Sequence, residues 1–390
     1  PQPIIVYSHF GLLALVSTGL VTNKKQLVKE MLIEGESFSE FSGGQVNTLE
    51  LVGKIIAGEK SFKKGLEKLF AEINGSLSLL ILTSKGIYAV RDSRGRSTLV
   101  VGQKRGSLAV ASESCAFPNL GFTFKSELKP GEVIFLNKNG IQKITRFKNE
   151  QKYCAFSWIY TGYPASTYNG VSVEEVRERS GANLAKKDLK EGLKADLVAG
   201  IPDSGTAYAI GYAQEAKIPL RRVLMKYTPG YGRSFLPPSK EERDQIAQKK
   251  LLPIPALIAG KKIVICDDSI VRGTQLRNQV INRLWEYGAA EIHLRIGCPP
   301  LLFACPYFLS TRTTTELAAR RAIDEVHLSS KPVSAFTKES PSSRRMVKRI
   351  AQSLGVTSLV YQSINEMVEA ISLPAESLCL YCWQGGKDKK

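Results

Sequence analysis

Two adjacent carboxylates and a loop of small residues stand together in the segment KKIVICDDSIVRGTQ, residues 261–275. Small residues let backbone N–H groups close around a phosphate, and the hydroxyls of Ser269 and Thr274 can donate further hydrogen bonds to it. Carboxylates repel a phosphate, but they suit the vicinal hydroxyls of a sugar, either directly or through magnesium. The segment therefore predicts a site for a ribose 5-phosphate group, formed by Asp267, Asp268, Ser269, Ile270, Val271, Arg272, Gly273 and Thr274.

The elements around this segment predict a parallel sheet. An acidic pair at the end of a strand is common in such sheets without any ligand, so the pair alone does not decide between a structural and a functional role. From about Tyr153 the pattern alternates between apolar strands and helices, which is typical of a parallel sheet with crossover helices. Ligands bind such sheets at the carboxyl ends of the strands. Strands are expected at residues 195–202, 262–268 and 291–297, and helices at 206–216 and 274–288.

The first 148 residues follow a different pattern. Apolar strands alternate with amphipathic helices, and turn signals at Asn74-Gly75 and Asn139-Gly140 indicate antiparallel hairpins. We therefore expect two domains, an α+β domain over residues 1–148 and an α/β domain over residues 149–390.

The string VICDDSIVRGT closely resembles the phosphoribosyl pyrophosphate (PRPP) motif of type I phosphoribosyltransferases. The form DDSIVRGT is similar to that of the amidophosphoribosyltransferase family, which begins purine synthesis by replacing the pyrophosphate of PRPP with ammonia. The segment GIPDSGTAYAIGYA resembles the family's pyrophosphate loop, which implies that Asp203, Ser204 and Gly205 cradle the leaving group. The resemblance also implies magnesium near Ser204, Asp267 and Asp268. It implies an Ntn-hydrolase-like N-terminal domain and a type I phosphoribosyltransferase domain with a mainly parallel sheet.

Two further segments are compared with the family pattern. LMKYTPGYGRSFLPP resembles the family's flexible lid and implies that Lys226 and Arg233 stabilise the pyrophosphate. The usual Asn-Arg pair of that lid is replaced by Tyr227-Thr228, which removes one cation near the pyrophosphate. Residues 314–343 are polar and unlike the family's usual link, so we expect a variable or mobile insertion there.

Four of the seven cysteines form a candidate metal centre. Two of them make a C-x-x-C pattern, which also suits zinc. Some members of the family carry a structural 4Fe–4S cluster, with ligands in segments resembling CAFSWIY, PPLLFACPYF and LCLYCWQGG. The resemblance implies that Cys154, Cys305, Cys379 and Cys382 bind such a cluster with one thiolate per iron. A zinc site with the same four ligands is the alternative.

The N-terminal half resembles the family's glutaminase domain in a degenerate form. The family's nucleophile is a cysteine at the start of the processed chain, whereas no cysteine precedes Cys115 in this sequence. Thr18 stands at the position of the oxyanion asparagine, and Thr48 at that of the aspartate that holds the glutamine amine. We therefore expect no glutaminase nucleophile and no thioester chemistry. A truncated N-terminus is an alternative, but it would not restore the two replaced residues.

Composition and charge restrict the partners. The net charge of +18 favours anionic ligands, but the basic residues are spread along the chain without interleaved aromatics, which argues against nucleic acid. No apolar run reaches the roughly 20 residues that a membrane span needs, and no signal-peptide pattern opens the sequence. We therefore expect a cytoplasmic protein with no membrane partner.

Two functions are consistent with these patterns. The first is a PRPP-dependent transferase that uses free ammonia or another small nucleophile. For this enzyme the resemblance implies purine nucleotides as inhibitors and a homo-oligomer or a hetero-complex. The second is a non-catalytic paralogue that binds PRPP or nucleotides and regulates, or assembles with, an active partner.

Overall fold

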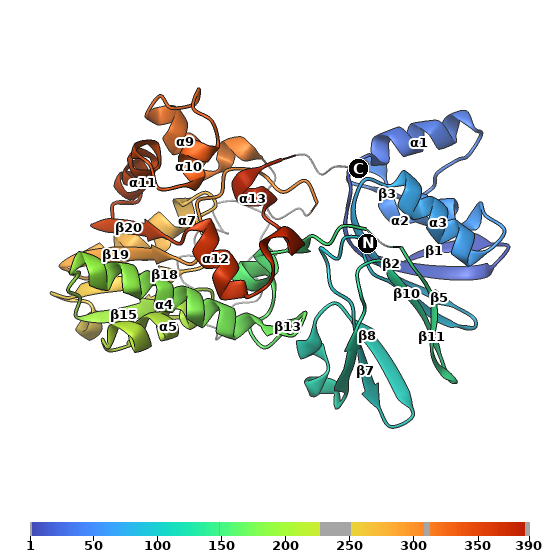
Figure 1. The fold of residues 1–390 in the computed structure, drawn as a ribbon, viewed down its shortest axis with the longest axis horizontal. Helices are drawn as coiled ribbons and strands as arrows, with labels where there is room; N and C mark the ends of the chain where they lie inside the picture. Colours follow the sequence, from blue (N-terminus) through green and yellow to red (C-terminus); the bar gives the residue numbers. More distant parts are fainter. Residues whose placement is uncertain (1, 148, 227–250, 308–312, 387–390) are drawn as a thin grey trace.

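The computed structural model describes residues 2–147, 149–226, 251–307 and 313–386. Figure 1 shows two lobes, an N-terminal lobe drawn in blue to teal and a C-terminal lobe drawn in green to red. The predicted lid, apart from Lys226, lies outside the described residues, and so does Arg233. No helix within the described ranges is long and apolar enough to cross a membrane.

The N-terminal lobe is built on a six-stranded antiparallel sheet. One face of this sheet is covered by helices, and a second, three-stranded sheet packs on part of the other face. The six strands, in spatial order, are β1 (Ile4–Ser8), β2 (Gly11–Val21), β5 (Gly75–Thr83), β6 (Gly86–Val90), β10 (Glu132–Asn137) and β11 (Gly140–Arg146). The helices are α1 (Lys24–Ile33), α2 (Thr48–Ala57) and α3 (Phe62–Glu72), and the smaller sheet has the order β8 (Ser107–Ala111), β7 (Val100–Lys104) and β9 (Thr123–Glu127).

Alternation along the strands explains this layering. Leu13 and Leu15 of β2 are buried under the helices, as are the alternate residues Leu77, Leu79 and Ile81 of β5. Successive side chains of a strand point to opposite faces, so the residues between them face away from the helices. The helix starts are set by local capping: the side chains of Asn47 and Ser61 accept backbone N–H hydrogen bonds at the start of α2 and α3.

The C-terminal lobe contains a four-stranded parallel sheet, as the sequence predicts. Val198, Val264 and Cys266 pack under two long helices on one face, whereas Ile263 and Ile265 belong to the larger core on the other face. The strands, in spatial order, are β15 (Leu197–Gly200), β18 (Lys262–Asp267), β19 (Glu291–Ile296) and β20 (Ser358–Tyr361). The helices include α4 (Val173–Glu191) and α5 (Thr206–Ala216) on the first face, with α7 (Thr274–Leu276), α8 (Asn282–Glu286), α11 (Pro341–Leu354) and α12 (Ile364–Ile371) elsewhere in the lobe.

The expectation that residues 314–343 are mobile is wrong. These residues form a turn at Thr314–Glu316 and the helices α9 (Ala318–Glu325) and α10 (Ser334–Thr337). Leu317, Ile323 and Phe336 are buried in the core of the lobe. The segment is polar on average, but its few apolar side chains recur on one helical face and supply enough buried surface to fold it against the lobe.

Candidate functional site

The two predicted phosphate-binding segments meet at the carboxyl edge of the parallel sheet. Strands β15 and β18 are hydrogen-bonded neighbours, and the segments that follow them emerge side by side (Figure 1). The hydroxyl Oγ of Ser204 donates a hydrogen bond to Oδ1 of Asp267 at 2.6 Å. Residues 63 positions apart in the sequence therefore meet at this edge of the sheet.

The loop after β15 lies against the end of β18. The backbone N–H of Ile201 donates to the carbonyl oxygen of Cys266, and the N–H of Gly205 donates to the carbonyl oxygen of Ile201. A Cβ atom at Gly205 would lie 1.9 Å from the Cys266 carbonyl oxygen, so only glycine allows this approach. The sequence thus places Asp203 and Ser204 on a tight turn that directs them to the strand end.

Burial makes the acidic pair unusual. Asp267 and Asp268 are 9% and 4% exposed. Loss of solvent raises the pKa of both carboxyls, and the adjacent charge of Asp267 raises the pKa of Asp268 further. Hydrogen bonds from Ser204 and Ser269 oppose the shift without reversing it. Such a pair gains most from a ligand that brings a positive charge or hydroxyl donors to it.

Tyr160 and Arg177 belong to this site, and the sequence analysis missed both. Burial, and then the charges of Asp268 and Asp267, raise the pKa of the hydroxyl of Tyr160, whose side chain is otherwise 55% exposed. Arg177 of α4 is 4% exposed and fixes the turn that carries Tyr160. In the segment CAFSWIYTG, only the cysteine was predicted to be functional. An arginine on a charged helix gives no sequence signal that marks it as buried.

The base of the lid contributes one described cation. Lys226 ends the short strand β16 (Leu224–Lys226), which pairs with β17 (Leu251–Pro253). Its Nζ lies 3.0 Å from Oδ2 of Asp203. Both side chains are exposed, so solvent screens this ion pair and leaves Lys226 free to exchange partners at little cost.

The four cysteines predicted as metal ligands gather from three segments. Strand β12 (Tyr153–Cys154) pairs with β21 (Leu378–Cys379), which puts Cys154 opposite Cys379. Burial, followed by the charges of Cys379 and Cys305, raises the pKa of Cys154 to about 12. The thiols of Cys382 and Cys305 are hydrogen-bonded to each other, and Cys382 also feels the charges of the other two. Four mutually interacting thiols are therefore present, although no group of three or more His, Cys, Asp or Glu residues in the described ranges has the arrangement of a metal-ion site.

A cavity of about 220 Å³ lies between the lobes, next to these thiols. Its walls include Cys154, Cys305 and Cys382 of the C-terminal lobe and Thr18 and Arg96 of the N-terminal lobe. Thr18, at the position predicted for an oxyanion residue, thus faces the junction between the lobes.

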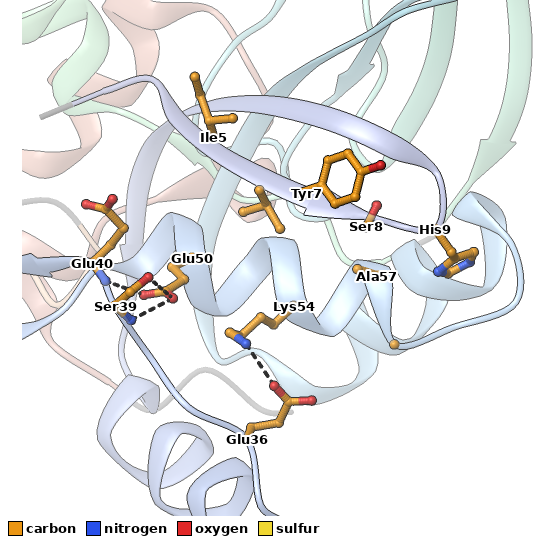
Figure 2. Close-up of a pocket in the computed structure, with 12 residues that line it drawn as sticks. Ile5, Tyr7, Ser8, His9, Glu36, Ser39, Glu40, Glu50, Lys54 and Ala57 are labelled. Carbon is orange, nitrogen blue, oxygen red and sulfur yellow. Dashed lines mark hydrogen bonds and ion pairs between the residues drawn. The ribbon is translucent and has the colours of Figure 1, made fainter.

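A second cavity, of about 350 Å³, lies in the N-terminal lobe between β1 and α2 (Figure 2). Four of its polar residues bond to Glu50 or to each other. The buried carboxylate of Glu50 accepts hydrogen bonds from the N–H and hydroxyl of Ser39 and from the N–H of Glu40, and Lys54 pairs with Glu36 at 2.8 Å. This arrangement anchors residues 36–40 to α2, which gives Glu50 a structural role.

The chain is similar to known proteins over nearly its whole length. A glutamine amidotransferase domain family matches residues 1–119. The amidophosphoribosyltransferase of Methanocaldococcus jannaschii is 32% identical over 98% of this chain and 78% of its own length. That of Bacillus subtilis is 31% identical over 98% of this chain and 75% of its own length.

Solved structures confirm the predicted fold of both lobes. The Bacillus subtilis glutamine PRPP amidotransferase complexed with ADP and GMP superposes with a TM-score of 0.82 at 30% identity, covering 99% of this chain and 79% of that one. The chain accordingly has an Ntn-hydrolase-like α+β domain and a type I phosphoribosyltransferase domain with a mainly parallel sheet. With more than 30% identity over nearly its whole length to named members, the chain belongs to the amidophosphoribosyltransferase family.

Proposed function

We propose that the chain is a PRPP-dependent phosphoribosyltransferase that delivers the phosphoribosyl group to ammonia. The observation that carries this proposal is the contact between Ser204 and Asp267, which joins the pyrophosphate loop to the ribose-binding acidic pair. The names of the relatives agree with it, because they are amidophosphoribosyltransferases.

Each group has a role in the proposed reaction. Asp267 and Asp268 hold the ribose hydroxyls, residues 269–274 hold the 5-phosphate, and Asp203, Ser204 and Gly205 cradle the pyrophosphate. Lys226 and Arg233 neutralise the leaving group, and the lid excludes water. The nitrogen lone pair of ammonia forms a bond to the anomeric carbon while the bond from that carbon to the pyrophosphate oxygen breaks. Pyrophosphate leaves with the electron pair, and the amine releases its extra proton to water.

Magnesium fits the donor set of this site. Oxygen atoms of Asp267, Asp268 and Ser204 converge at the strand end, and hard oxygen donors are the ligands that magnesium takes in proteins. Bound magnesium would supply positive charge to the pyrophosphate and would reverse the cost of ionising two buried carboxyls.

We also propose that glutaminase activity is lost. Thr18 and Thr48 replace the residues that hold the oxyanion and the glutamine amine in the family pattern. Both substitutions lie within the described chain, so the argument does not depend on its first residue. Ammonia would then come from solution or from a partner protein.

We further propose that the four cysteines hold a 4Fe–4S cluster with a structural role, with zinc as the alternative. The thiols of Cys154 and Cys382 each have their pKa raised by other cysteines of this set, so the four side chains lie in one cluster. Iron, sulfide and zinc analysis of anaerobically purified protein distinguishes the two metals. Zinc at one equivalent, without iron, would overturn the cluster.

The test of the main proposal is pyrophosphate release from PRPP with magnesium, using ammonium and glutamine in parallel on the same protein. We expect release with ammonium and none above background with glutamine. Asp267→Asn should abolish pyrophosphate release with ammonium. The control is Asp324→Asn, which changes a carboxylate of α9 that accepts a hydrogen bond from Ser329, and it should leave pyrophosphate release unchanged. Release with glutamine equal to that with ammonium would refute the loss of glutaminase activity, and no release with either would refute the enzyme.

The replacement of a lid cation by Tyr227-Thr228 favours a second candidate, a non-catalytic paralogue that binds PRPP or purine nucleotides within a homo-oligomer or hetero-complex. The Bacillus subtilis relative was solved with ADP and GMP, so these nucleotides are the natural probes for inhibition or regulation. Calorimetric binding of PRPP without turnover would favour this candidate.

A further inference from the structure

The phosphate loop, residues 269–274, is held from outside by helix α9. The backbone N–H of Ala318 donates to the carbonyl oxygen of Val271 at 2.7 Å. The guanidinium of Arg321 donates to the carbonyl oxygen of Arg272. Two consecutive carbonyl groups of the loop thus have their hydrogen-bond partners on the same helix.

These two contacts determine where the neighbouring N–H groups point. Both peptides are trans, and the carbonyl and N–H of a trans peptide point in opposite directions. Because the carbonyls of Val271 and Arg272 face α9, the N–H groups of Arg272 and Gly273 face away from it. No described residue accepts a hydrogen bond from either N–H. Two adjacent N–H groups that point the same way form an anion-binding concavity.

A third contact holds the loop's own cation on the outside. Nη2 of Arg272 lies 2.5 Å from Oε2 of Glu316, in the turn just before α9. Gly273 adopts a left-handed conformation with φ of +77°, which lets the chain turn from this outer contact into α7. The guanidinium is therefore a tether of the loop rather than part of its inner surface.

We propose that Glu316, Ala318 and Arg321 are positioning residues: by fixing the outer carbonyls and side chain of the loop, they aim its N–H groups at the 5-phosphate of PRPP. This inference rests on the proposed function and extends it to a segment that the sequence had marked as a mere insertion. We call Glu316, Ala318 and Arg321 the clamp. The clamp orders the loop before the ligand binds, which lowers the entropy cost of binding.

One substitution removes a single clamp atom. Ala318 is the first residue of α9, a position that accepts proline, and Leu317 before it has φ −68° and ψ 130°, which a following proline requires. Ala318→Pro therefore deletes the N–H donor and keeps the helix. Arg321→Met deletes the second donor, with Arg321→Lys as the conservative rescue. Arg345→Met is the matched control, because Arg345 donates to the carbonyl of Val326 at the other end of α9.

Calorimetry with ribose 5-phosphate, and with PRPP and magnesium, measures the effect. We expect Ala318→Pro and Arg321→Met each to raise the Kd of ribose 5-phosphate about tenfold, as for the loss of one hydrogen bond that orients a charged contact. KM for PRPP should rise while kcat at saturation stays unchanged, Arg321→Lys should recover part of the affinity, and the control should match the parent. If Ala318→Pro does not fold, the affinities of Arg321→Met and Arg321→Lys for ribose 5-phosphate still test the clamp.

The outcomes separate the two proposals. A parent protein that binds ribose 5-phosphate as tightly as its Arg321→Met and folded Ala318→Pro variants would overturn the clamp and leave the enzyme proposal standing. A parent that binds neither ribose 5-phosphate nor PRPP would overturn both.

Discussion

Replacement of Arg177 by methionine should destabilise the turn at residues 157–162, which the Arg177 guanidinium holds by hydrogen bonds. Arg177 donates to the carbonyl oxygens of Trp158 at 2.9 Å, Tyr160 at 3.2 Å and Gly162 at 2.8 Å. Each bond from a charged donor contributes about 1.5 kcal/mol, and methionine fills the space but leaves three carbonyls unpaired. We therefore expect the free energy of unfolding to fall by about 4 kcal/mol, near the upper limit for single substitutions. For a lobe of this size that corresponds to a Tm lower by roughly 10 °C.

Thermal unfolding, combined with hydrogen exchange of residues 157–162, tests this expectation. The matched control is Arg179→Met on the same helix, where a half-exposed arginine donates to the carbonyl of Ala370. It should cost about 1 kcal/mol and leave exchange in the turn unchanged. Equal Tm values for the two variants, or unaltered exchange at residues 157–162 in Arg177→Met, would show that the turn is held by something other than this guanidinium.

Four further outcomes follow from the contacts described above. Because the pKa values of Asp267 and Asp268 are raised, the stability linked to this pair in the ligand-free protein is fully present below the ordinary aspartate pKa and is lost as pH rises through the raised values. Asp268→Asn should therefore make the free energy of unfolding, measured in urea melts between pH 4 and 8, depend less on pH, and a slope unchanged from the parent would contradict this. Magnesium binding, measured by calorimetry, should tighten over the same pH interval because both carboxyls must release protons. Glu50→Gln should destabilise the N-terminal lobe by about 2 kcal/mol in chemical denaturation, since one of the two accepting oxygens becomes a donor facing backbone N–H groups. Gly205→Ala should abolish PRPP binding in a calorimetric titration, whereas Gly58→Ala, at a φ of −68°, should be tolerated.

The parts of the fold that sequence reasoning predicted are those encoded locally. The strands of the parallel sheet and the loops after β15 and β18 follow from short apolar runs ending in small and acidic residues. Adjacency of Ser204 and Asp267 then follows from topology, because parallel strands present their carboxyl ends at one edge. These features needed no knowledge of distant contacts.

The parts that were missed depend on partners far apart in the chain. Arg177 is buried only because three carbonyls of a turn 15 to 19 residues earlier surround its guanidinium. Residues 314–343 look polar because their few apolar side chains are separated by charged ones, and α9 folds only against a core supplied by other segments. Long-range desolvation and packing of this kind leave no mark in a local pattern.

The pairing of β12 with β21 has a consequence for the order in which the protein matures. Lys152 Nζ bonds to the carbonyl oxygen of Glu376, 224 positions later, and the indole of Trp383 donates to the carbonyl of Pro299 close by. At about 5–20 residues per second, a ribosome needs roughly 11–45 s to travel between these two points. The nascent chain therefore waits, with strand β12 unpaired, until the residues of β21 have been synthesised. Translation products that end before β21 would be left with an unfinished C-terminal lobe, and proteolysis would recognise them by that unpaired strand.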